Sequence, residues 1–455
     1  MKRLVIIGGG IAGLSAAWEA LRSGAALDIT LIECDERLGG KIRTDQSEGF
    51  LLEQGPDSFL TQKPEALQLC ETLGIADRLI ARTPRGGHSF IMHAHALAPL
   101  PDGFSGLVPM DTAALAVSPL LSEAGKRRAM ESASTEIESA PAAAGGDDES
   151  VASFIVRRFG EEVFQLIVEP LVGGIHAGDA SQLSRAAVLG SPHRAVDPVP
   201  TARPPFLAFS KGMAELVRAL EGKLAGVTVL RGIAAESVRR RDGGYLVEVA
   251  DGGRREADAL ILAAPAYVTS RLVAPLDPGM QGLLGLIPFA STVVIHLAYR
   301  RSDVAHPLDG YGYLIPSVER SDLVACSWIS QKWDGRAPED RVLLRLFAGR
   351  FGRRDLLGTS DDELVGLARA ELSATLGLTA EPVLQRIHRW DMGMPQYTVG
   401  HLRRVEDIMT RAAAFPGLFL AGSSYGGVGI PQCIESGTRA SSDALRYLVR
   451  QGAYT

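Results

Sequence analysis

Glycines at positions 8, 10 and 13 have a spacing suited to phosphate binding, within Gly8-Gly9-Gly10-Ile11-Ala12-Gly13. An apolar run precedes them and a helical pattern follows. They therefore predict a tight strand-to-helix turn where the backbone approaches a pyrophosphate. The free N–H groups and the positive end of the helix would bind the phosphates. Glu33 follows near the end of the next predicted strand, where a carboxylate can accept hydrogen bonds from ribose hydroxyls.

The same spacing could belong to an ordinary turn, because 50 of the 455 residues are glycine. Its surroundings favour a dinucleotide site. The run Arg3–Ile7 predicts a buried strand before the turn, Leu14–Leu21 predicts a helix after it, and Asp28–Ile32 predicts a second strand. Together these elements predict a βαβ unit of the Rossmann type.

A second glycine pair, Gly39–Gly40, is more than an NAD fold requires. It lets another backbone segment lie against an extended dinucleotide, with Arg37 and Arg43 available to phosphate or flavin oxygens. The alternative is a surface turn with two solvated arginines. The loop Glu53–Phe59 then leads to a predicted helix, Lys63–Leu73.

The end of the chain repeats the glycine-rich arrangement. Gly417–Gly422 predicts a strand that ends in glycine, Ser423–Pro431 a loop, and Gln432–Leu448 a helix. Proline at the first turn of a helix wastes no donor. Two such sites fit FAD, because the first takes the pyrophosphate and the second the ribityl chain and flavin ring. A helix N-terminus near the flavin N1–C2=O edge would stabilise the anionic reduced flavin.

Composition limits the class of protein. The length of 455 residues suggests two domains, and a net charge of −6 argues against a nucleic-acid partner. The four cysteines (Cys34, Cys70, Cys326, Cys433) are scattered, so we expect a reducing compartment and neither disulfides nor a metal site. A strand at residue 3 leaves no room for a signal peptide, and no apolar run has the length of a membrane span. We expect a cytoplasmic protein, either soluble or bound to a surface.

The remaining pattern divides into three parts. Residues 86–205 read as a helical insertion with a mobile connection at 139–150. The apolar surface 104–121 would rest on a membrane or pack on the rest of the protein. A helix reaching Leu224 and a meander of strands follow Phe206, and a second sheet follows Thr292. The predicted helices are 124–138, 151–166, 209–224 and 360–376. The predicted strands are 227–230, 234–241, 244–249, 257–263, 292–299, 310–316, 322–329, 341–348 and 382–390.

Seven motifs in the same order, spread over nearly the whole chain, resemble the FAD-dependent porphyrinogen oxidases of the flavin amine oxidase superfamily. They are GGGIAGLSAAWEAL with Glu33, ERLGGKIRT (Glu36–Thr44), EQGPDSFL (Glu53–Leu60), GGIHAGDASQLS (Gly173–Ser184), SKGM (Ser210–Met213), MPQYTVGH (Met394–His401) and LAGSSYGGVGIPQCIESG (Leu420–Gly437). GPDSF, GIHAGD, PQYTVGH and GVGIPQCIESG point most narrowly to this family.

The resemblance implies an α/β fold. A Rossmann-type FAD-binding domain, GR2-like with the arrangement of p-hydroxybenzoate hydroxylase, would be joined by a mixed-sheet substrate domain and a helical insertion. We expect the FAD-binding domain at 1–85, 206–270 and 405–455, the insertion at 86–205 as a possible membrane-facing domain, and the substrate-binding domain at 271–404. The expected FAD-binding residues are Gly8, Gly10, Ile11, Ala12, Gly13, Glu33, Arg37, Gly39, Gly40, Lys41, Gly55, Pro56, Asp57, Val238, Gly422, Val428, Gly429 and Ile430. Val238, where backbone could meet an adenine, reads equally well as a core valine.

The implied reaction is the six-electron oxidation of a porphyrinogen to a porphyrin in haem biosynthesis, with dioxygen reduced to hydrogen peroxide. Coproporphyrinogen III is favoured, and protoporphyrinogen IX is the alternative. Lys63, after GPDSF, is the candidate for pairing with a substrate propionate; otherwise it is an exposed helix-start lysine. The expected partners are the porphyrinogen, dioxygen and, transiently, a downstream ferrochelatase. The protein would be a monomer or homodimer, free in the cytoplasm or peripheral on the inner face of the membrane.

Such a reaction needs orientation and a dry cavity more than it needs reactive side chains. No catalytic base is therefore assigned. His176 and His401 are candidates, although a structural role fits each better, and Cys433 suits packing better than a covalent flavin bond.

Two other classes share some of these features. A flavin amine oxidase would favour an aromatic pair facing the flavin, and a carotenoid desaturase should bind a membrane more tightly. A non-catalytic flavoprotein would hold inert FAD or none, which the intact glycines argue against.

Overall fold

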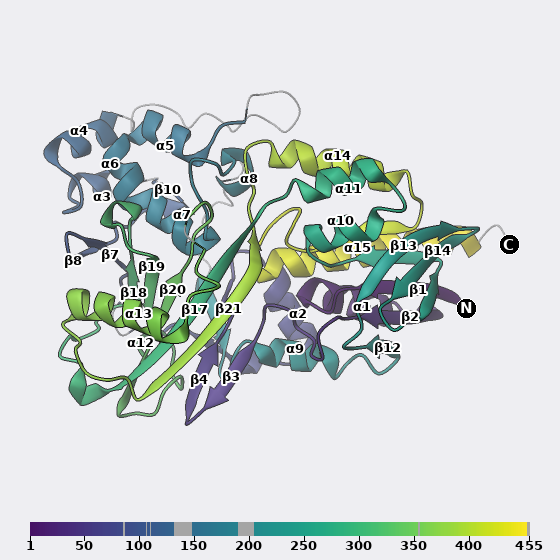
Figure 1. Ribbon diagram of the computed structural model, residues 1–455, viewed down its shortest axis with the longest axis horizontal. Helices are drawn as coiled ribbons and strands as arrows, with labels where there is room; N and C mark the ends of the chain where they lie inside the picture. Colours follow the sequence, from purple (N-terminus) through teal and green to yellow (C-terminus); the bar gives the residue numbers. More distant parts are fainter. Residues whose placement is uncertain are drawn as a thin grey trace.

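The computed structural model describes residues 1–84, 87–105, 107–109, 111–131, 148–189, 204–353 and 355–452. The predicted connection 139–150 lies largely outside these ranges, as does the end of the predicted helix 124–138. Two sheets organise the molecule, and a layer of helices lies at one end (Figure 1).

The first sheet is parallel, with strand order β12-β2-β1-β16-β22. Successive residues of its central strand face opposite sides. Leu4 and Ile6 enter one hydrophobic core, and Val5 and Ile7 enter another, as expected of a strand buried on both faces. The strands are β1 (Lys2–Ile7), β2 (Leu27–Ile32), β12 (Val227–Leu230), β16 (Ala259–Leu262) and β22 (Leu418–Leu420). The sequence placed β12 in a meander; it instead forms the edge of this sheet beside β2.

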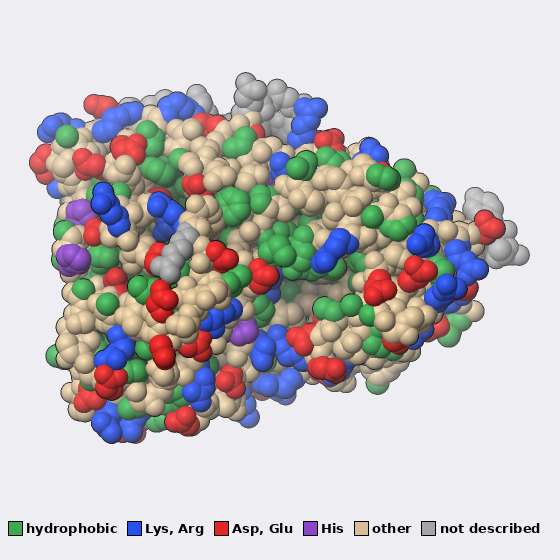
Figure 2. Space-filling view, in the orientation of Figure 1, with side chains coloured by type: hydrophobic (Ala, Val, Ile, Leu, Met, Phe, Trp, Pro, Cys, Tyr) green, Lys and Arg blue, Asp and Glu red, His purple; other side chains and the backbone are tan. Residues whose placement is uncertain are grey.

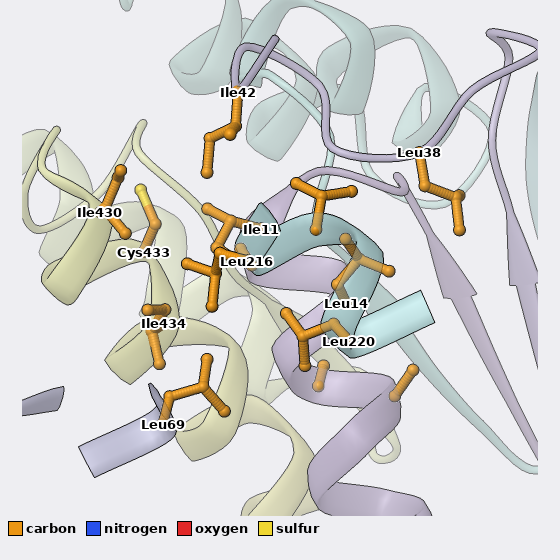
Figure 3. Close-up of a cluster of buried hydrophobic side chains, with 14 of the residues drawn as sticks. Ile11, Leu14, Leu38, Ile42, Leu69, Leu216, Leu220, Ile430, Cys433 and Ile434 are labelled. Carbon is orange, nitrogen blue, oxygen red and sulfur yellow. The ribbon is translucent and has the colours of Figure 1, made fainter. Parts of the chain in front are cut away.

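Helices cover one face of the parallel sheet. Figure 3 shows side chains from several of them meeting in one core, among them Leu14, Leu69, Leu216 and Ile434. These helices are α1 (Ile11–Arg22), α2 (Glu65–Leu73), α9 (Ala214–Glu221) and α15 (Ile430–Gly452). Their apolar faces hold α1 and α15 side by side above the sheet.

The opposite face carries a small antiparallel sheet and three further helices. The small sheet is the predicted meander, here in the order β13-β14-β15. The elements are β13 (Ala235–Arg241), β14 (Gly244–Val249), β15 (Arg254–Ala257), α10 (Ala266–Val273), α11 (Pro278–Gly285) and α14 (His401–Ala413).

The second large sheet has the order β21-β17-β20-β19-β18-β7-β8 and is antiparallel except between β18 and β7. Two of its strands come from residues 86–205, where the sequence predicted only helices. The strands are β7 (Phe90–His93), β8 (Ala96–Pro99), β17 (Phe289–Arg300), β18 (Gly312–Leu314), β19 (Leu323–Trp328), β20 (Arg341–Ala348) and β21 (Leu384–Pro395). The helices α12 (Ile329–Lys332) and α13 (Asp361–Leu376) accompany them.

The helical layer has its own core. The helix predicted at 151–166 is interrupted at Gly160, whose φ of 92° suits glycine, and continues through a π-helical turn, Phe164–Val168. The helices are α3 (Thr112–Ala116), α4 (Glu123–Glu131), α5 (Val151–Phe159), α6 (Glu161–Val163), α7 (Glu169–His176) and α8 (Arg185–Leu189). Leu107, Leu115, Leu120 and Leu121 of the predicted apolar surface are buried in this core, whereas Val117 is exposed.

Short elements join these parts. They are β3 (Thr44–Ser47), β4 (Phe50–Glu53), β5 (Phe59–Leu60), β6 (Leu79–Ala81), β9 (Phe104–Ser105), β10 (Val108–Pro109), β11 (Phe206–Phe209) and 3-10 turns at Ala76–Arg78, Arg301–Asp303 and Ser317–Glu319.

Figure 2 shows hydrophobic side chains gathered at the centre of this face, over the region where β17 and β21 meet α10. Tyr267 of α10 and Phe289 of β17 pack edge to face, with ring centroids 5.0 Å apart. Among the described helices, none has both the length and the apolar character that a membrane crossing needs.

Candidate functional site

The glycine turn after β1 has the predicted tight geometry. Gly8 has a φ of 110°, and its N–H donates to the Ile32 carbonyl at 2.8 Å. A Cβ at Gly13 would overlap the Gly8 carbonyl oxygen, so α1 approaches the turn only because residue 13 is glycine. At Gly10, the N-cap of α1, nothing lies within 4 Å of an added Cβ, and no side chain caps the helix. The first turn of α1 therefore presents free N–H groups to open space, which suits a phosphate.

Glu33 lies directly beside this turn. Its carboxylate accepts from the backbone N–H of Gly9 at 2.6 Å and of Asp35 at 2.8 Å. The Cys34 thiol donates to the same carboxylate at 3.2 Å, and burial raises the pKa of that thiol to about 11. These contacts fix an anionic acceptor at the carboxyl end of β2, where a ribose would be bound.

The second glycine pair, Gly39–Gly40, packs against the glycine turn that follows β1. Gly39 donates to the Gly9 carbonyl at 2.8 Å, and a Cβ at Gly40 would lie 3.2 Å from the Cα of Gly10. The Arg37 guanidinium donates to the carbonyls of Leu38, Gly40 and Ile42, so in this structure it ties the loop together.

Lys41 supplies a buried cation at this point. Burial lowers the pKa of its ammonium, and Cys433, at the start of α15, lies close to it. Lys41 forms no ion pair with a carboxylate among the residues the structure describes. A buried cation without an anionic partner is costly, and the phosphate or flavin oxygens of FAD would provide one.

A third loop, Gln54–Ser58, packs against Lys41. A Cβ at Gly55 would overlap the Lys41 carbonyl oxygen, and Arg345 of β20 donates to the Gly55 carbonyl. The Asp57 carboxylate accepts from Lys332 at 2.8 Å and from the indole of Trp333 at 3.2 Å. The indole of Trp390 donates to the Gln54 carbonyl at 2.7 Å. The second large sheet therefore holds this loop in place.

The closing segment brings a second helix N-terminus to the site. Gly422 has a φ of 110°, and its N–H donates to the Ser436 hydroxyl at 3.0 Å. A Cβ at Gly437 would overlap the Ala12 carbonyl oxygen, so the second turn of α15 is in direct backbone contact with the first turn of α1. Val428, Gly429 and Ile430 lead into α15.

The motif at 394–401 joins two distant segments to this loop. Gln396 donates to the His176 carbonyl at 2.9 Å, and the Tyr397 hydroxyl donates to the Ser423 carbonyl while accepting from Gly427 N–H at 2.8 Å. Sequence reasoning named the motif but assigned no role to Gln396 or Tyr397. It named the motif that contains Ser436 but gave that residue no role, and it missed Arg345, Lys332 and Trp333, for which no local pattern is a signal.

The remaining candidates are more scattered. Val238 is fully buried on β13 and pairs with Val247 of β14. Lys63 is exposed just before α2. Cys433 is buried in the first turn of α15, and burial raises the pKa of its thiol to about 11. His176 ends α7, and burial lowers its pKa to about 4.

His401 gives a testable pH dependence. It is fully buried and stacks on Tyr397 with ring centroids 4.0 Å apart; neither ring nitrogen has a hydrogen-bond partner in the described structure. Burial lowers its pKa to about 4, against about 6.5 in an unfolded chain. The unfolded state therefore binds the proton more readily, so this contribution to stability is present above pH 6.5 and is lost as the pH falls towards 4.

A His401→Phe variant keeps the stacked ring and removes the titration. We expect its Tm to fall less than the wild-type Tm between pH 6.5 and 4.5, and to match the wild-type Tm at pH 8. Differential scanning calorimetry across this range measures both values. Identical pH profiles for the two proteins would contradict the assigned role.

Comparison with known proteins gives concordant results. The family model for flavin containing amine oxidoreductase matches residues 11–445. The coproporphyrinogen III oxidase of Bacillus subtilis is 32% identical, with 98% of each chain covered. Protoporphyrinogen oxidase 1, chloroplastic, of Arabidopsis thaliana is 27% identical over 98% of this chain and 88% of its own. The crystal structure of a provisionally assigned protoporphyrinogen oxidase from Exiguobacterium superposes with a TM-score of 0.84 at 30% identity, covering 98% of this chain and 99% of the other.

Proposed function

We infer that this chain, which belongs to the family of flavin containing amine oxidoreductases, is an FAD-dependent oxidoreductase that oxidises a porphyrinogen to a porphyrin in haem biosynthesis. The observation that carries this inference is the full-length similarity to coproporphyrinogen III oxidases, combined with two helix N-termini that meet at one glycine-rich site. Dioxygen is the electron acceptor that this class of oxidase uses.

The described residues fit FAD, because Lys41 is a buried cation without a carboxylate partner and Gly10 borders open space. We propose that the glycine turn and α1 bind the pyrophosphate, that Glu33 binds the ribose, and that Lys41 and the loop Val428–Ile430 lie at the flavin. Gly55, Pro56 and Asp57 would form the neighbouring wall. When bound, FAD supplies the hydride acceptor that dioxygen reoxidises.

The protein's own contribution is orientation and the exclusion of water. His176 and His401 have lowered pKa values of about 4 because they are buried, so both rings are neutral at physiological pH. His401 stacks on Tyr397 and Gln396 binds the His176 carbonyl, so both histidines serve the architecture around the closing loop. We assign neither as a base. Protons leave the porphyrinogen nitrogens as conjugation grows.

We propose coproporphyrinogen III as the substrate and Lys63 as a group that pairs with one of its propionates. Several relatives with about a third of their residues identical carry the name coproporphyrinogen III oxidase, which supports this choice over protoporphyrinogen IX. The exposure of Lys63 at the end of the loop that begins at the flavin site also supports it.

Further parts of the proposal concern organisation. We propose FAD-binding segments at 1–85, 206–270 and 405–455 and a substrate-binding part at 271–404, to which β7 and β8 contribute. The helical layer at 86–205 would make any peripheral contact with a membrane from the cytoplasm. The porphyrin product would pass to a ferrochelatase.

Parallel assays test the substrate assignment. Porphyrin fluorescence and peroxide release would be followed with coproporphyrinogen III and protoporphyrinogen IX, after correction for spontaneous oxidation. Faster turnover of the four-carboxylate substrate is expected. Preference for protoporphyrinogen would reverse the assignment. The bound flavin should also be reduced by a porphyrinogen in the absence of oxygen. If neither porphyrinogen reduces it, the amine oxidases and carotenoid desaturases become the favoured classes.

A further inference from the structure

Arg82, just after β6, is held between two aromatic rings. Its guanidinium carbon lies 4.3 Å from the ring centroid of Phe206 and 4.6 Å from that of Tyr311. The side chain is half-buried. Within the described part of the chain, no hydrogen bond or ion pair reaches its guanidinium. The donors of a planar cation are thus left for a group that the chain itself does not provide.

The surroundings of Arg82 are rigid. The Tyr311 hydroxyl donates to the Thr83 carbonyl at 2.9 Å, and Thr83 N–H donates to the Lys332 carbonyl at 3.1 Å. Phe206 pairs with Leu60 in the small sheet formed by β5, β11 and β6. Contact with both rings therefore restricts the position of the guanidinium, and little conformational freedom would be lost when it binds an anion.

The charge of Arg82 is not neutralised by its neighbours. Burial lowers the pKa of its guanidinium, and nearby Tyr311 and Asp57 offset only part of this effect. The Asp57 carboxylate already accepts hydrogen bonds from Lys332 and Trp333, and Arg345 lies close to it as well. Asp57 is therefore engaged by Lys332 and Arg345, and Glu53 and Arg336 belong to the same charged cluster. An external anion would accept hydrogen bonds from the Arg82 guanidinium, whose donors are unused within the described structure.

Arg82 also borders the segment that connects the two proposed sites. The chain runs from Gly55, which packs on Lys41, through Asp57 to Leu60, and Lys63 follows. Because Phe206 contacts Arg82 and pairs with Leu60, the guanidinium lies beside this segment between the flavin loop and Lys63.

We propose that Arg82 binds a second carboxylate of the tetrapyrrole, separate from the propionate that pairs with Lys63. This inference rests on the proposed function, because it takes the substrate to be a polycarboxylate. Arg82 would therefore contribute to the affinity for a tetrapyrrole that carries at least two propionates.

Binding of the product coproporphyrin III to the FAD-loaded enzyme tests the inference without turnover. Quenching of porphyrin fluorescence would be titrated for the wild type and for the Arg82→Gln, Lys63→Gln and Arg240→Gln variants. Arg240 is an exposed arginine on β13 and serves as the control. Loss of one charge-assisted contact is expected to weaken binding about 10-fold in Arg82→Gln. Binding should be unchanged in Arg240→Gln.

Kinetics separate binding from folding. Arg82→Gln should raise KM for coproporphyrinogen III with little change in kcat, in flavin absorbance or in Tm. If Arg82→Gln fails to fold, Arg82→Lys replaces it in the experiment. This variant keeps the charge but not the planar guanidinium, so its affinity for coproporphyrin III should lie between the wild-type value and a value about 10-fold weaker. Wild-type affinity in a folded Arg82 variant would overturn this inference alone. A wild-type enzyme that neither binds coproporphyrin nor oxidises either porphyrinogen would overturn the proposed function as well.

Discussion

A Gly437→Val variant is expected to purify without flavin. Any Cβ at this position overlaps the Ala12 carbonyl oxygen and lies 2.8 Å from the Ala12 carbonyl carbon, and both atoms are rigid backbone. The helices α15 and α1 would have to separate, which would move apart the two N-termini proposed to hold the dinucleotide. Gly437 lies inside a helix, so helix propensity alone would predict that alanine stabilises the fold by up to about 1 kcal/mol. A loss of flavin would therefore come from the overlap with Ala12.

Gly366→Ala provides a matched control. Gly366 lies inside α13, and no atom comes within 4 Å of an added Cβ. We expect this change to leave the flavin content unaltered and to stabilise the fold slightly, by about 0.5–1 kcal/mol. The measurement is the ratio of flavin to protein absorbance after purification, together with Tm. Gly437→Ala and Gly437→Val proteins with a full complement of FAD would show that the close approach of the two helices is unnecessary.

Of the substitutions considered, Asp57→Asn is expected to lower the free energy of unfolding the most. It leaves Lys332 and Arg345 without the carboxylate that they share, in a region where all three side chains are largely buried. Removing one partner from a buried ion pair typically costs about 3–5 kcal/mol, since the remaining charge is uncompensated. Urea unfolding of the flavin-free proteins measures the effect.

Two further variants isolate the cause. Asp57→Asn combined with Lys332→Met removes both charges and should recover part of the loss. Glu381→Gln breaks an exposed pair with Arg369 and should cost less than about 1 kcal/mol. A single Asp57→Asn variant as stable as Glu381→Gln would refute the importance of the buried charge.

The pH dependence of this effect has a definite sign. Burial alone would raise the pKa of Asp57, but the Lys332 ammonium and Arg345 guanidinium hold it well below its usual range. Its stabilising contribution is therefore complete above the unfolded pKa of about 3.9 and is lost only as the pH falls below that value. Between pH 5 and 8, the difference between wild type and Asp57→Asn should stay constant.

The sequence alone predicted those parts of the site that are formed by residues close together in the chain. The turn at Gly8–Gly13, the helix after it and the second strand form a continuous unit, and glycine spacing reports directly on backbone approach. The loop before α15 was predicted for the same reason. These predictions needed no information about distant residues.

Pairings between distant segments could not be predicted in this way. Lys332 and Asp57 are 275 positions apart, and nothing near either residue indicates the other. Val227–Leu230 has the alternation of either a meander strand or a parallel edge strand, and only its pairing with β2 distinguishes them. The two strands at 90–99 were missed because β7 pairs with β18, which lies far along the chain in the same sheet, and β8 pairs only with β7.

The backbone contact between Ala12 and Gly437 has a consequence for biosynthesis. A chain leaving the ribosome presents α1 early, but β22 and α15 are the last elements to emerge, and domains form as their parts become available. Until then, one edge of the parallel sheet is unpaired and the proposed cofactor pocket lacks its second helix. On the proposed assignment, a stable complex with FAD cannot form before α15 has emerged, and a message truncated before residue 430 is expected to yield a protein that added flavin does not rescue.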